Sequence, residues 1–540
     1  MVPGVRLPLQ TRAEMLAVLV RRGMVRPIRP DRLARAGVAL HRWGPTLAGS
    51  FTVNAITRAD QPALIDDHES VTYGEIESRT NAIARGLQAN GLTAGDRLGI
   101  LCRNEASFIE TMVATSKVGA DALLLNTSLS APELGAVLRR EQPKVLVHDG
   151  EFTDIVTEAD AGPVARVVAE NDGAGAGTPT LADLRGGDPS PLDPPPEEGR
   201  TVILTSGTTG APKGAQVRRA ENLEPLAWFL GRVPIDAGSV CLEPAPLYHA
   251  HGLGQTIIAT GIGCTVVLPR RFDPLETLAL IERHRVRVLT VVPTMLQRIM
   301  DLDPAERERY DTSTLRVVVC SGSALPGQLA HDFMDQFGDV LYNLYGSTEV
   351  AWATIATPRD LREAPGTVGR PPQHTRLEIL DDDGRPRPPG ETGHIFVGHE
   401  MLFEGYTDPS QSRRVVDGMM TPGDLGHVDE EGRLFVDSRV DDMIISGGEN
   451  VYPGQVEEVL RTHPDVDDAV VMGVEDERFG QRLIAYVVPR PGSELTGETV
   501  IGFARDNLAR FKVPREVHLR DELPRNALGK VLRRELRPTG

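Results

Sequence analysis

The sequence has few cysteines, four in 540 residues, and no two of them form a Cys-x-x-Cys pair. Because Cys102, Cys241, Cys264 and Cys320 lie far apart, we predict neither a zinc cage nor a disulfide framework. Long hydrophobic runs are also missing, since no stretch approaches the roughly 18 apolar residues that cross a bilayer. The apolar segment near the start is too short for a secretory signal, and we expect a cytoplasmic protein.

The chain lacks the positive charge that nucleic-acid binding requires, because its formal net charge is −18 at pH 7. The first 50 residues are the exception: nine arginines against Glu14 and Asp31 give +7, which leaves −25 for the rest. Two helices are predicted in this basic arm, one capped by Thr11 with Glu14 and ended by Gly23, and one that starts at Asp31. We favour an arm folded back on the acidic body, with peripheral contact to an anionic membrane as the alternative.

The length of 540 residues exceeds what one core supports, so two or more folding units are expected. From about residue 50 strand-like runs alternate with amphipathic segments, as in RVRVLTVV before PTMLQRIMDL and TLRVVVCSG before LPGQLAHDFMDQFG, which is typical of α/β proteins. After about residue 375 the pattern changes to hairpins such as RLEIL and GHIFV. The last part combines the helix PGQVEEVLRTH with the strands DAVVMGV and RLIAYVV, and we place its boundary near Arg439.

The segment TSGTTGAPKG, residues 205–214, directly follows the apolar run TVIL. Glycine N–H groups, hydroxyls and a lysine can together cradle phosphate. The P-loop pattern requires Ser or Thr after Gly-Lys, whereas Lys213 follows Pro212 and precedes Gly214. The segment is therefore either a phosphate loop of another kind or a flexible surface loop.

Five further stretches carry residues suited to chemistry. PLYHAHG contains His249 and a second histidine, but a metal site needs a third ligand that is missing nearby. LYGSTEV places Glu349 beside hydroxyls, which suits a Mg²⁺ that bridges phosphates, and TPGDLG holds Asp424 in a turn where it can accept ribose hydroxyls. SRVDDMIISGGEN lies at the proposed boundary, and PRNALGKVLRREL presents Lys530. Each stretch alone also has a purely structural explanation.

Together, in order and spacing, these stretches resemble the adenylate-forming superfamily, which includes acyl-CoA synthetases, firefly luciferase and the adenylation domains of peptide synthetases. The resemblance covers roughly residues 50 to 540, and TSGTTGAPKG, YGSTE and the terminal GK are its most specific parts. It implies a large N-terminal domain of mixed sheets flanked by helices plus a small distorted β-barrel, followed by a small mobile α+β domain. The expected divisions are an arm at 1–50, an AMP-binding domain at 51–438, a hinge at 439–445 and a C-terminal domain at 446–540.

The resemblance implies an ATP-dependent ligase that makes an acyl-adenylate and pyrophosphate, and then an acyl-CoA and AMP. Two anions must meet in the first step, so donors and cations are needed where charge accumulates. Glu349 is expected to hold Mg²⁺, Thr348 to contact phosphate, and Lys530 to bridge the carboxylate, the α-phosphate and the ribose oxygen. The mobile loop over the β- and γ-phosphates would be formed by Thr205, Ser206, Gly207, Thr208, Thr209, Gly210 and Lys213.

The resemblance also implies a nucleoside site and a hinge. Adenine is expected to lie against Tyr345, which with Gly346 and Ser347 forms one side of the nucleotide site, and Ser323 and Ala324 form the other side. Asp424 and Arg439 are expected to hold the ribose. The C-terminal domain would rotate about Asp441, withdrawing Lys530 and bringing Ser446, Gly447 and Gly448 to coenzyme A. One departure stands out: the family usually has Thr directly before Gly-Asp, whereas this chain has Pro422 there and Thr421 one place earlier, which puts the local hydrogen bonding in doubt.

Substrate choice depends on pocket walls, which are positions without a motif. We expect the acyl pocket near His249, Gly252, Val292, Pro293, Met295, Ser321, Gly346, Trp352 and Ala353. Because these are mostly apolar and provide no basic partner, they favour a medium- or long-chain fatty acid, with an aryl acid as the runner-up and an adenylate-only ligase as a further alternative. The implied small molecules are the acid, ATP, Mg²⁺ and coenzyme A, no nucleic-acid partner is expected, and a homodimer is compatible with the sequence.

Overall fold

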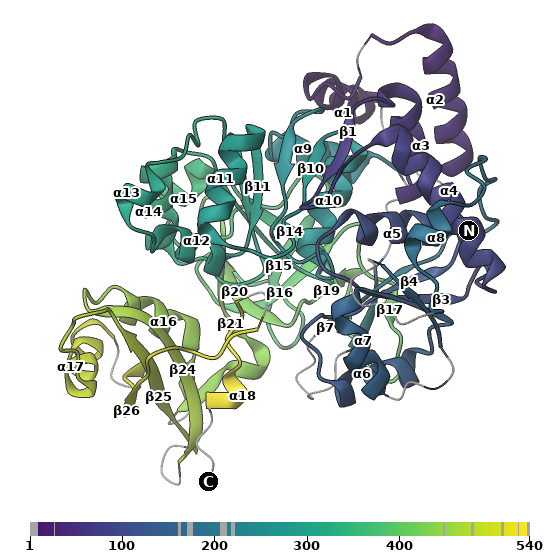
Figure 1. Cartoon of the computed structure of the whole chain (residues 1–540). Coiled ribbons are helices and arrows are strands. Elements are labelled where there is room, and N and C mark those ends of the chain that lie inside the picture. Colours follow the sequence, from purple (N-terminus) through teal and green to yellow (C-terminus); the bar gives the residue numbers. More distant parts are fainter. Residues whose placement is uncertain are drawn as a thin grey trace.

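The computed structural model describes residues 9–25, 27–159, 162, 164–169, 177–205, 213–217, 222–446, 449–476, 480–508, 512–526 and 529–536. A large N-terminal part is built around three sheets, and a smaller C-terminal part around a fourth (Figure 1). The predicted α/β class is confirmed.

The first sheet is parallel in its centre, because βα units deliver its strands in the same direction. Antiparallel strands cover both edges. Its order is β14 (Ala351–Ala356), β13 (Leu341–Ser347), β12 (Val317–Cys320), β11 (Val288–Val291), β9 (Val240–Leu242), β10 (Thr265–Val267), β1 (Pro62–Ile65) and β2 (Ser70–Thr72).

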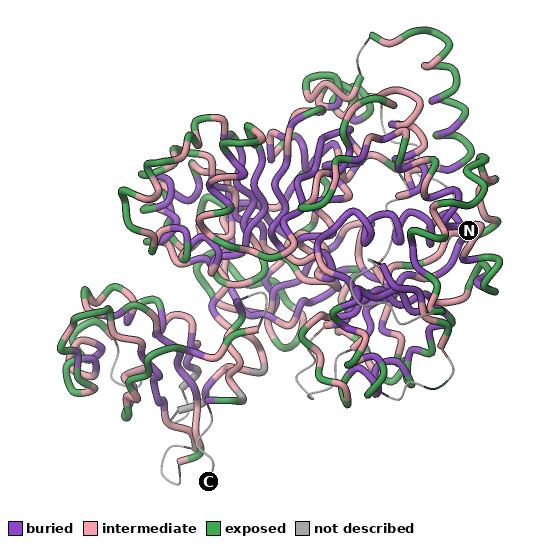
Figure 2. Tube along the Cα trace, in the orientation of Figure 1, coloured by how far each residue is buried: buried purple, intermediate pink, exposed green. Residues whose placement is uncertain are grey.

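The second sheet has the same plan, with a parallel centre and an antiparallel edge. Its order is β17 (Gly405–Tyr406), β8 (Lys213–Val217), β7 (Thr201–Thr205), β4 (Asp121–Leu124), β3 (Arg97–Leu101), β5 (Val145–His148) and β6 (Ala165–Val168). One continuous buried core contains strand residues of both sheets, among them Ile100 and Val266. The interior of the large part is correspondingly buried throughout (Figure 2).

Helices cover these two sheets. They are α3 (Leu47–Arg58), α4 (Tyr73–Ala89), α5 (Ala106–Val118), α6 (Ala131–Glu141), α7 (Thr153–Glu158), α8 (Leu181–Arg185), α9 (Glu224–Arg232), α10 (Ala250–Gly261), α11 (Pro274–His284), α12 (Pro293–Met300), α13 (Pro304–Arg307), α14 (Gly327–Phe337) and α15 (Pro358–Glu363), with the 3₁₀ turn η1 (Gly150–Phe152). No helix of the described residues is both long enough and apolar enough to cross a membrane.

The third sheet is antiparallel and takes the place expected for a small barrel. It contains β18 (Val415–Val416), β19 (Met419–Met420), β16 (Gly393–Gly398), β20 (Asp424–Val428) and β21 (Leu434–Arg439), with β15 (Arg376–Leu380) paired to β16. The predicted hairpin of RLEIL and GHIFV is confirmed as β15 and β16. This sheet matters for the site because β20 begins and β21 ends at the same edge, where Asp424 pairs in register with Arg439.

The C-terminal part has its own sheet and its own buried core. The sheet runs β23 (Glu449–Val451), β22 (Ile444–Ser446), β25 (Gly480–Pro489) and β24 (Val466–Asp476), with β26 (Glu516–Leu519) paired to β25. The helices are α16 (Pro453–Arg461), α17 (Gly497–Asn507) and α18 (Arg533–Leu536). The turn η2 (Val440–Asp442) connects β21 to β22 and therefore joins the two parts.

The basic arm forms the two predicted helices, α1 (Leu9–Arg21) and α2 (Pro30–Trp43). It folds back on the body, because Arg22 pairs with Asp236 and Arg42 with Asp193. The predicted cap at Thr11 is wrong: the helix already runs through Leu9, and the Thr11 side chain is buried. Packing against the body overrides the local capping signal.

Candidate active site

Tyr345, Asp424 and Arg439 meet where β13 ends beside the edge of the third sheet. The Tyr345 hydroxyl donates to Oδ2 of Asp424 at 2.6 Å, and Nη1 of Arg439 lies 3.1 Å from Oδ1. Burial and the neighbouring Asp424 carboxylate raise the pKa of Tyr345 well above its ordinary value. The phenol therefore stays protonated, and a carboxylate that can accept two hydroxyls stands beside an aromatic ring, as a nucleoside requires.

The turn before Asp424 explains the departure at Pro422. Thr421 is buried, and its hydroxyl accepts a hydrogen bond from the N–H of Gly423 at 3.0 Å. Gly423 has φ of +89°, a conformation that favours glycine. Thr421 thus stabilises the turn through the hydrogen bond to Gly423.

Glu349 follows β13 by two residues and is only 4% exposed. Its Oε1 accepts from the Tyr406 hydroxyl at 2.6 Å and from Nη2 of Arg413 at 2.9 Å, while Nε of Arg413 donates to the Tyr406 oxygen at 2.9 Å. Burial alone would raise the pKa of Glu349, but these two donors outweigh it and lower the pKa. The carboxylate is therefore ionised inside the protein.

The ionised Glu349 fits the Mg²⁺ that the resemblance implies. Both hydrogen bonds go to Oε1, which leaves Oε2 for a cation. Among the described residues no group of three or more His, Cys, Asp or Glu side chains could hold a metal ion by itself. A single carboxylate suits Mg²⁺ that keeps its waters and binds mainly through substrate phosphates.

Tyr406 and Arg413 were missed by the sequence reasoning, and so was Gln411, which accepts from Nζ of Lys213 at 2.7 Å. Tyr406 ends β17 and the other two follow it, so the three lie 57 to 64 positions after Glu349. They belong to no motif, and only the pairing of β17 with β8 brings them to the site. No local signal in the sequence could have identified them.

The predicted phosphate loop connects two antiparallel strands, with Thr205 at the end of β7 opposite Lys213 at the start of β8. Nζ of Lys213 lies 5.9 Å from the centre of the Tyr406 ring, so the lysine stands beside the Glu349 cluster. Ser206, Gly207, Thr208, Thr209 and Gly210 lie outside the described residues.

Lys530 reaches the nucleoside corner from the C-terminal part. Gly529, with φ of +74°, lies directly against Thr294 at the start of α12. The Lys530 N–H donates to Oδ1 of Asn526 at 2.9 Å, which closes the loop that presents the side chain. The pKa of Lys530 is lowered, first by lost hydration and then by Arg439, while Asp442 and Asp424 oppose the shift. The lysine therefore stands in the electrostatic field of the predicted ribose site.

The predicted hinge residue Asp441 lies in η2, between the last strand of the large part and the first strand of the small part. Arg533 connects this segment to the C-terminal core, since its Nη2 lies 2.7 Å from Glu457 and its Nε 3.7 Å from Asp442. Ser446 ends β22, whereas Gly447 and Gly448 lie outside the described residues. The roles of these residues remain predictions.

The two histidines differ in their surroundings. His249 stands at the N-cap of α10, and its buried Nε2 has no partner among the described residues. His251 lies two residues further, in the first turn of α10, with Nε2 3.0 Å from the carbonyl oxygen of Val291. Burial lowers the pKa of each histidine to about 4, so both are neutral at pH 7. His249 therefore offers a neutral imidazole nitrogen to a bound group.

Several of the other residues predicted for the nucleotide or the acid lie just after the carboxyl ends of parallel strands, where ligands of such sheets bind. Ser321, Ser323 and Ala324 follow β12, and the Ser321 hydroxyl donates to the Leu344 carbonyl at 2.8 Å. Thr348 lies in the turn after β13. Among the predicted acyl-pocket positions, Val292 and Met295 pack in the core around α12 and Ala353 in the core of the third sheet, while Gly252 is buried in α10. Pro293 starts α12, and Gly346 pairs with Trp352.

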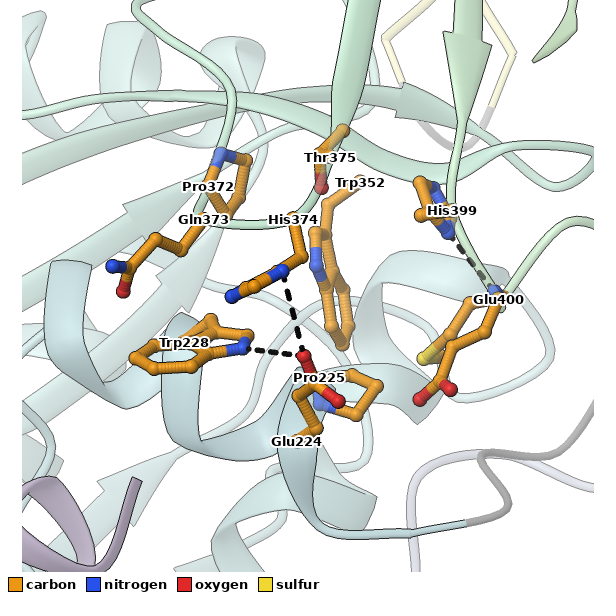
Figure 3. Close-up of a pocket in the computed structure, with 11 residues that line it drawn as sticks. Glu224, Pro225, Trp228, Trp352, Pro372, Gln373, His374, Thr375, His399 and Glu400 are labelled. Atoms are coloured by element: carbon orange, nitrogen blue, oxygen red, sulfur yellow. Dashed lines mark hydrogen bonds and ion pairs between the residues drawn. The ribbon is translucent and has the colours of Figure 1, made fainter. Parts of the chain in front are cut away.

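A pocket of about 160 Å³ lies beside β14 (Figure 3). Two of the chain's three tryptophans, Trp228 and Trp352, line it. Its remaining walls come from α9, from the segment before β15 and from the residues after β16, namely Glu224, Pro225, Pro372, Gln373, His374, Thr375, His399, Glu400 and Met401. The pocket therefore combines flat aromatic faces with a few polar groups.

The polar groups of this pocket are fixed by their neighbours. Oε1 of Glu224 accepts from Nε1 of Trp228 at 3.1 Å and lies 3.9 Å from Nδ1 of His374, whose ring stacks on Trp228 (Figure 3). His399 lies with Nε2 2.9 Å from the carbonyl of Val350, next to Glu349. The pocket thus adjoins the segment that carries Glu349, and Trp352 is the predicted acyl-pocket residue that lines it.

Comparison with known proteins agrees with this geometry. Residues 51–407 match the family described as AMP-binding enzyme, and residues 455–530 match the AMP-binding enzyme C-terminal domain. The chain belongs to the AMP-binding enzymes. Within the superfamily, the named relatives identify the CoA ligase branch, and the chain is an acid–thiol ligase.

Two relatives and one solved structure illustrate this branch. A feruloyl-CoA synthase of Amycolatopsis sp is 35% identical over 87% of this chain and 94% of its own. A fatty acid–acyl-carrier-protein ligase of Streptomyces coeruleorubidus is 32% identical over 91% of this chain and 96% of its own. The crystal structure of an anthranilate CoA ligase with anthranoyl-AMP superposes with a TM-score of 0.82 at 25% identity, covering 91% of this chain and 96% of that one. These AMP-binding enzymes act on carboxylic acids of different kinds.

Proposed function

We propose that this AMP-binding enzyme is an ATP-dependent aryl-acid–CoA ligase. The observation that carries the proposal is the pocket between Trp228 and Trp352, which adjoins the segment that holds Glu349. The acid, ATP and coenzyme A would be its substrates, and acyl-CoA, AMP and pyrophosphate its products.

The pocket has the size and the surface of a site for one ring. Its volume of about 160 Å³ is close to that of the roughly 150 Å³ cavities that bind benzene. Trp faces favour offset or edge-on aromatic contacts, and the Glu224 carboxylate can accept a hydrogen bond from a phenol, an indole or an amine. Glu349 lies three residues before Trp352, in the turn between β13 and β14, so the pocket adjoins the segment that would hold Mg²⁺.

In the first step a carboxylate oxygen of the acid attacks the α-phosphorus of ATP, and the bond to pyrophosphate breaks. Lys530 would offset the charge that develops on the carboxylate and the α-phosphate, while Asp424 and Arg439 hold the ribose. Glu349 would hold Mg²⁺, which when bound neutralises charge on the leaving pyrophosphate. Neutral His249 would border the acid carboxylate without adding charge.

In the second step the thiol of coenzyme A attacks the acyl carbonyl carbon and loses its proton, and AMP leaves. The C-terminal part, which presents Lys530, would rotate about Asp441 before this step and so withdraw the lysine. The backbone from Ser446 to Gly448 would then approach the acyl-adenylate. Rotation about a short connection such as η2 fits a hinge of few residues.

A medium- or long-chain fatty acid is the second candidate. It is supported by the apolar character of the predicted acid pocket and by the fatty-acid ligase among the relatives. The two candidates differ at the far end of the substrate, because an alkyl chain gains nothing from the Glu224 carboxylate. An enzyme that stops at the adenylate is the third alternative.

Pyrophosphate release with a panel of acids tests the proposal. We expect coumarate, benzoate and indoleacetate to give higher kcat/KM than octanoate, palmitate and acetate. Trp228→Leu and Trp352→Leu should raise the KM for the aryl acid at least about tenfold and leave the KM for ATP unchanged. Trp43→Phe is the matched control, because it changes the remaining tryptophan, which lies in the arm. Preference for palmitate, unaffected by Trp228→Leu, would overturn the aryl assignment while keeping the ligase.

A further inference from the structure

Exposed apolar side chains are concentrated in the arm. Among the described residues eight large hydrophobic side chains are exposed, and six of them lie between Leu16 and Leu40. The other two, Val415 and Leu519, lie far from each other in the sequence. Soluble proteins rarely gather exposed apolar residues in this way without a partner.

Helix α2 has two apolar faces. Ala36, Ala39 and Trp43 form the buried face, through which α2 packs against α3. Leu33 and Leu40, which are 61% and 43% exposed, are seven residues apart with Gly37 between them, so they share a second face. Val38 is 59% exposed as well, but it lies about 140° around the helix from Leu33 and so belongs to another side. Helix α2 lies at the edge of the molecule, and much of it is exposed there (Figures 1 and 2).

Helix α1 repeats the pattern on a smaller scale. Leu19 is buried, and Val18 packs near Gly231 of α9. Leu16 and Val20 are about half exposed and four residues apart, and Ala13 and Ala17 lie on the same side. Both helices of the arm therefore keep an unpartnered apolar stripe after folding.

Positive charge is concentrated in the same arm. Arg22 and Arg42 are used to hold the arm on the body, and Arg29 pairs with Asp31. Arg32 and Arg35 of α2 and Arg12 of α1 have no ion pair or hydrogen bond within the described part of the chain. The arm as a whole carries +7 against −25 for the remaining residues. A negatively charged partner is therefore expected for this surface.

We propose that α1 and α2 dock on a membrane surface that contains anionic lipid, with Leu33 and Leu40 entering the headgroup region. Interfacial helices bind in this manner, through an apolar face and flanking basic residues that contact anionic headgroups. A second copy of the chain fits less well, because a stable dimer buries about 800 Å² per partner and these narrow stripes offer few side chains.

Co-sedimentation of the full chain with vesicles tests the proposal. We expect binding to vesicles of phosphatidylcholine with phosphatidylglycerol, weak binding to phosphatidylcholine alone, and release by salt. Leu33→Glu with Leu40→Glu should abolish binding, and Arg32→Gln with Arg35→Gln should weaken it about fivefold per arginine. Leu519→Glu, at an exposed position elsewhere, is the matched control and should bind like the unchanged protein.

Two results would overturn the proposal. One is an unchanged protein that ignores anionic vesicles, or whose binding survives Leu33→Glu with Leu40→Glu. The other is a dimer in sedimentation velocity that the same pair of substitutions dissociates, because the occupant would then be a second copy. Tryptophan fluorescence and pyrophosphate release establish that each variant is folded and keeps its activity.

Discussion

Replacing Arg413 by Met should remove the positive charge that stabilises the buried carboxylate of Glu349. The side chain of Glu349 is 5% exposed and that of Arg413 25% exposed, and Oε1 of Glu349 accepts from both Arg413 and Tyr406. The variant removes the charged donor and leaves the Tyr406 hydroxyl as the remaining partner. A hydrogen bond to a charged group contributes about 1.5–3 kcal/mol, and we expect a loss of that size in the free energy of unfolding.

The loss should depend on pH. In the folded protein the pKa of Glu349 is below its ordinary 4.5, so its carboxylate stabilises the fold above that pH, and this is lost as the pH falls through the lowered pKa. Without Arg413 burial becomes dominant and raises the pKa of Glu349. The cost of Arg413→Met is therefore greatest near about pH 8 and shrinks towards about pH 5, where the carboxyl binds a proton more readily.

Urea unfolding followed by tryptophan fluorescence measures this cost. The three tryptophans, Trp43, Trp228 and Trp352, all lie in the arm and the large part, so the signal is independent of the C-terminal part. Arg414→Met is the matched control, because Arg414 donates to a backbone carbonyl and stacks over Phe396 without touching Glu349. Equal costs for the two variants, or a cost of Arg413→Met that persists in a Glu349→Gln background, would refute the reasoning.

Three further predictions concern the lysine, the hinge and the histidines. Lys530→Met should lower adenylate formation, measured as ATP–pyrophosphate exchange, by about 10²–10³-fold, and should affect thioester formation from supplied acyl-adenylate far less; equal losses in both steps would argue against a role confined to adenylation. Asp441→Pro should trap the C-terminal part in one arrangement, so that one step stops while the other continues, and unchanged thioester formation would contradict the hinge. His251 is neutral in the fold because burial lowers its pKa from 6.5 to about 4, so the protein should lose stability as the pH falls from 6.5 towards 4. His251→Gln should reduce that slope in urea unfolding, and an unchanged slope would show that other groups cause it.

The local patterns of the sequence predicted the elements well. The runs RVRVLTVV and TLRVVVCSG contain β11 and β12, and the C-terminal segments predicted as helices and strands are α16, β24, β25 and α17. The spacing of apolar residues and the turn residues are sufficient to predict these segments, because each of them buries one face. The cap at Thr11 failed because burial of α1 on the body decides where that helix begins.

The site was predictable only as far as its residues belong to motifs. Asp424, Arg439, Tyr345 and Lys530 come together although their motifs are widely separated in the chain. Tyr406 and Arg413 were not predictable, because pairing of short strands places them beside Glu349. The aromatic pocket was not predictable either, because Trp228, His374 and His399 come from three separate segments that share no sequence pattern.

The most direct measurement of the central claim is product analysis by mass spectrometry after incubation with ATP, Mg²⁺, coenzyme A and one aryl acid at a time. The account predicts that an aryl-CoA thioester forms together with AMP and pyrophosphate in equal amounts, and that omitting coenzyme A leaves the aryl-adenylate on the enzyme. Pyrophosphate and adenylate without a thioester, for every acid and in the presence of coenzyme A, would contradict it.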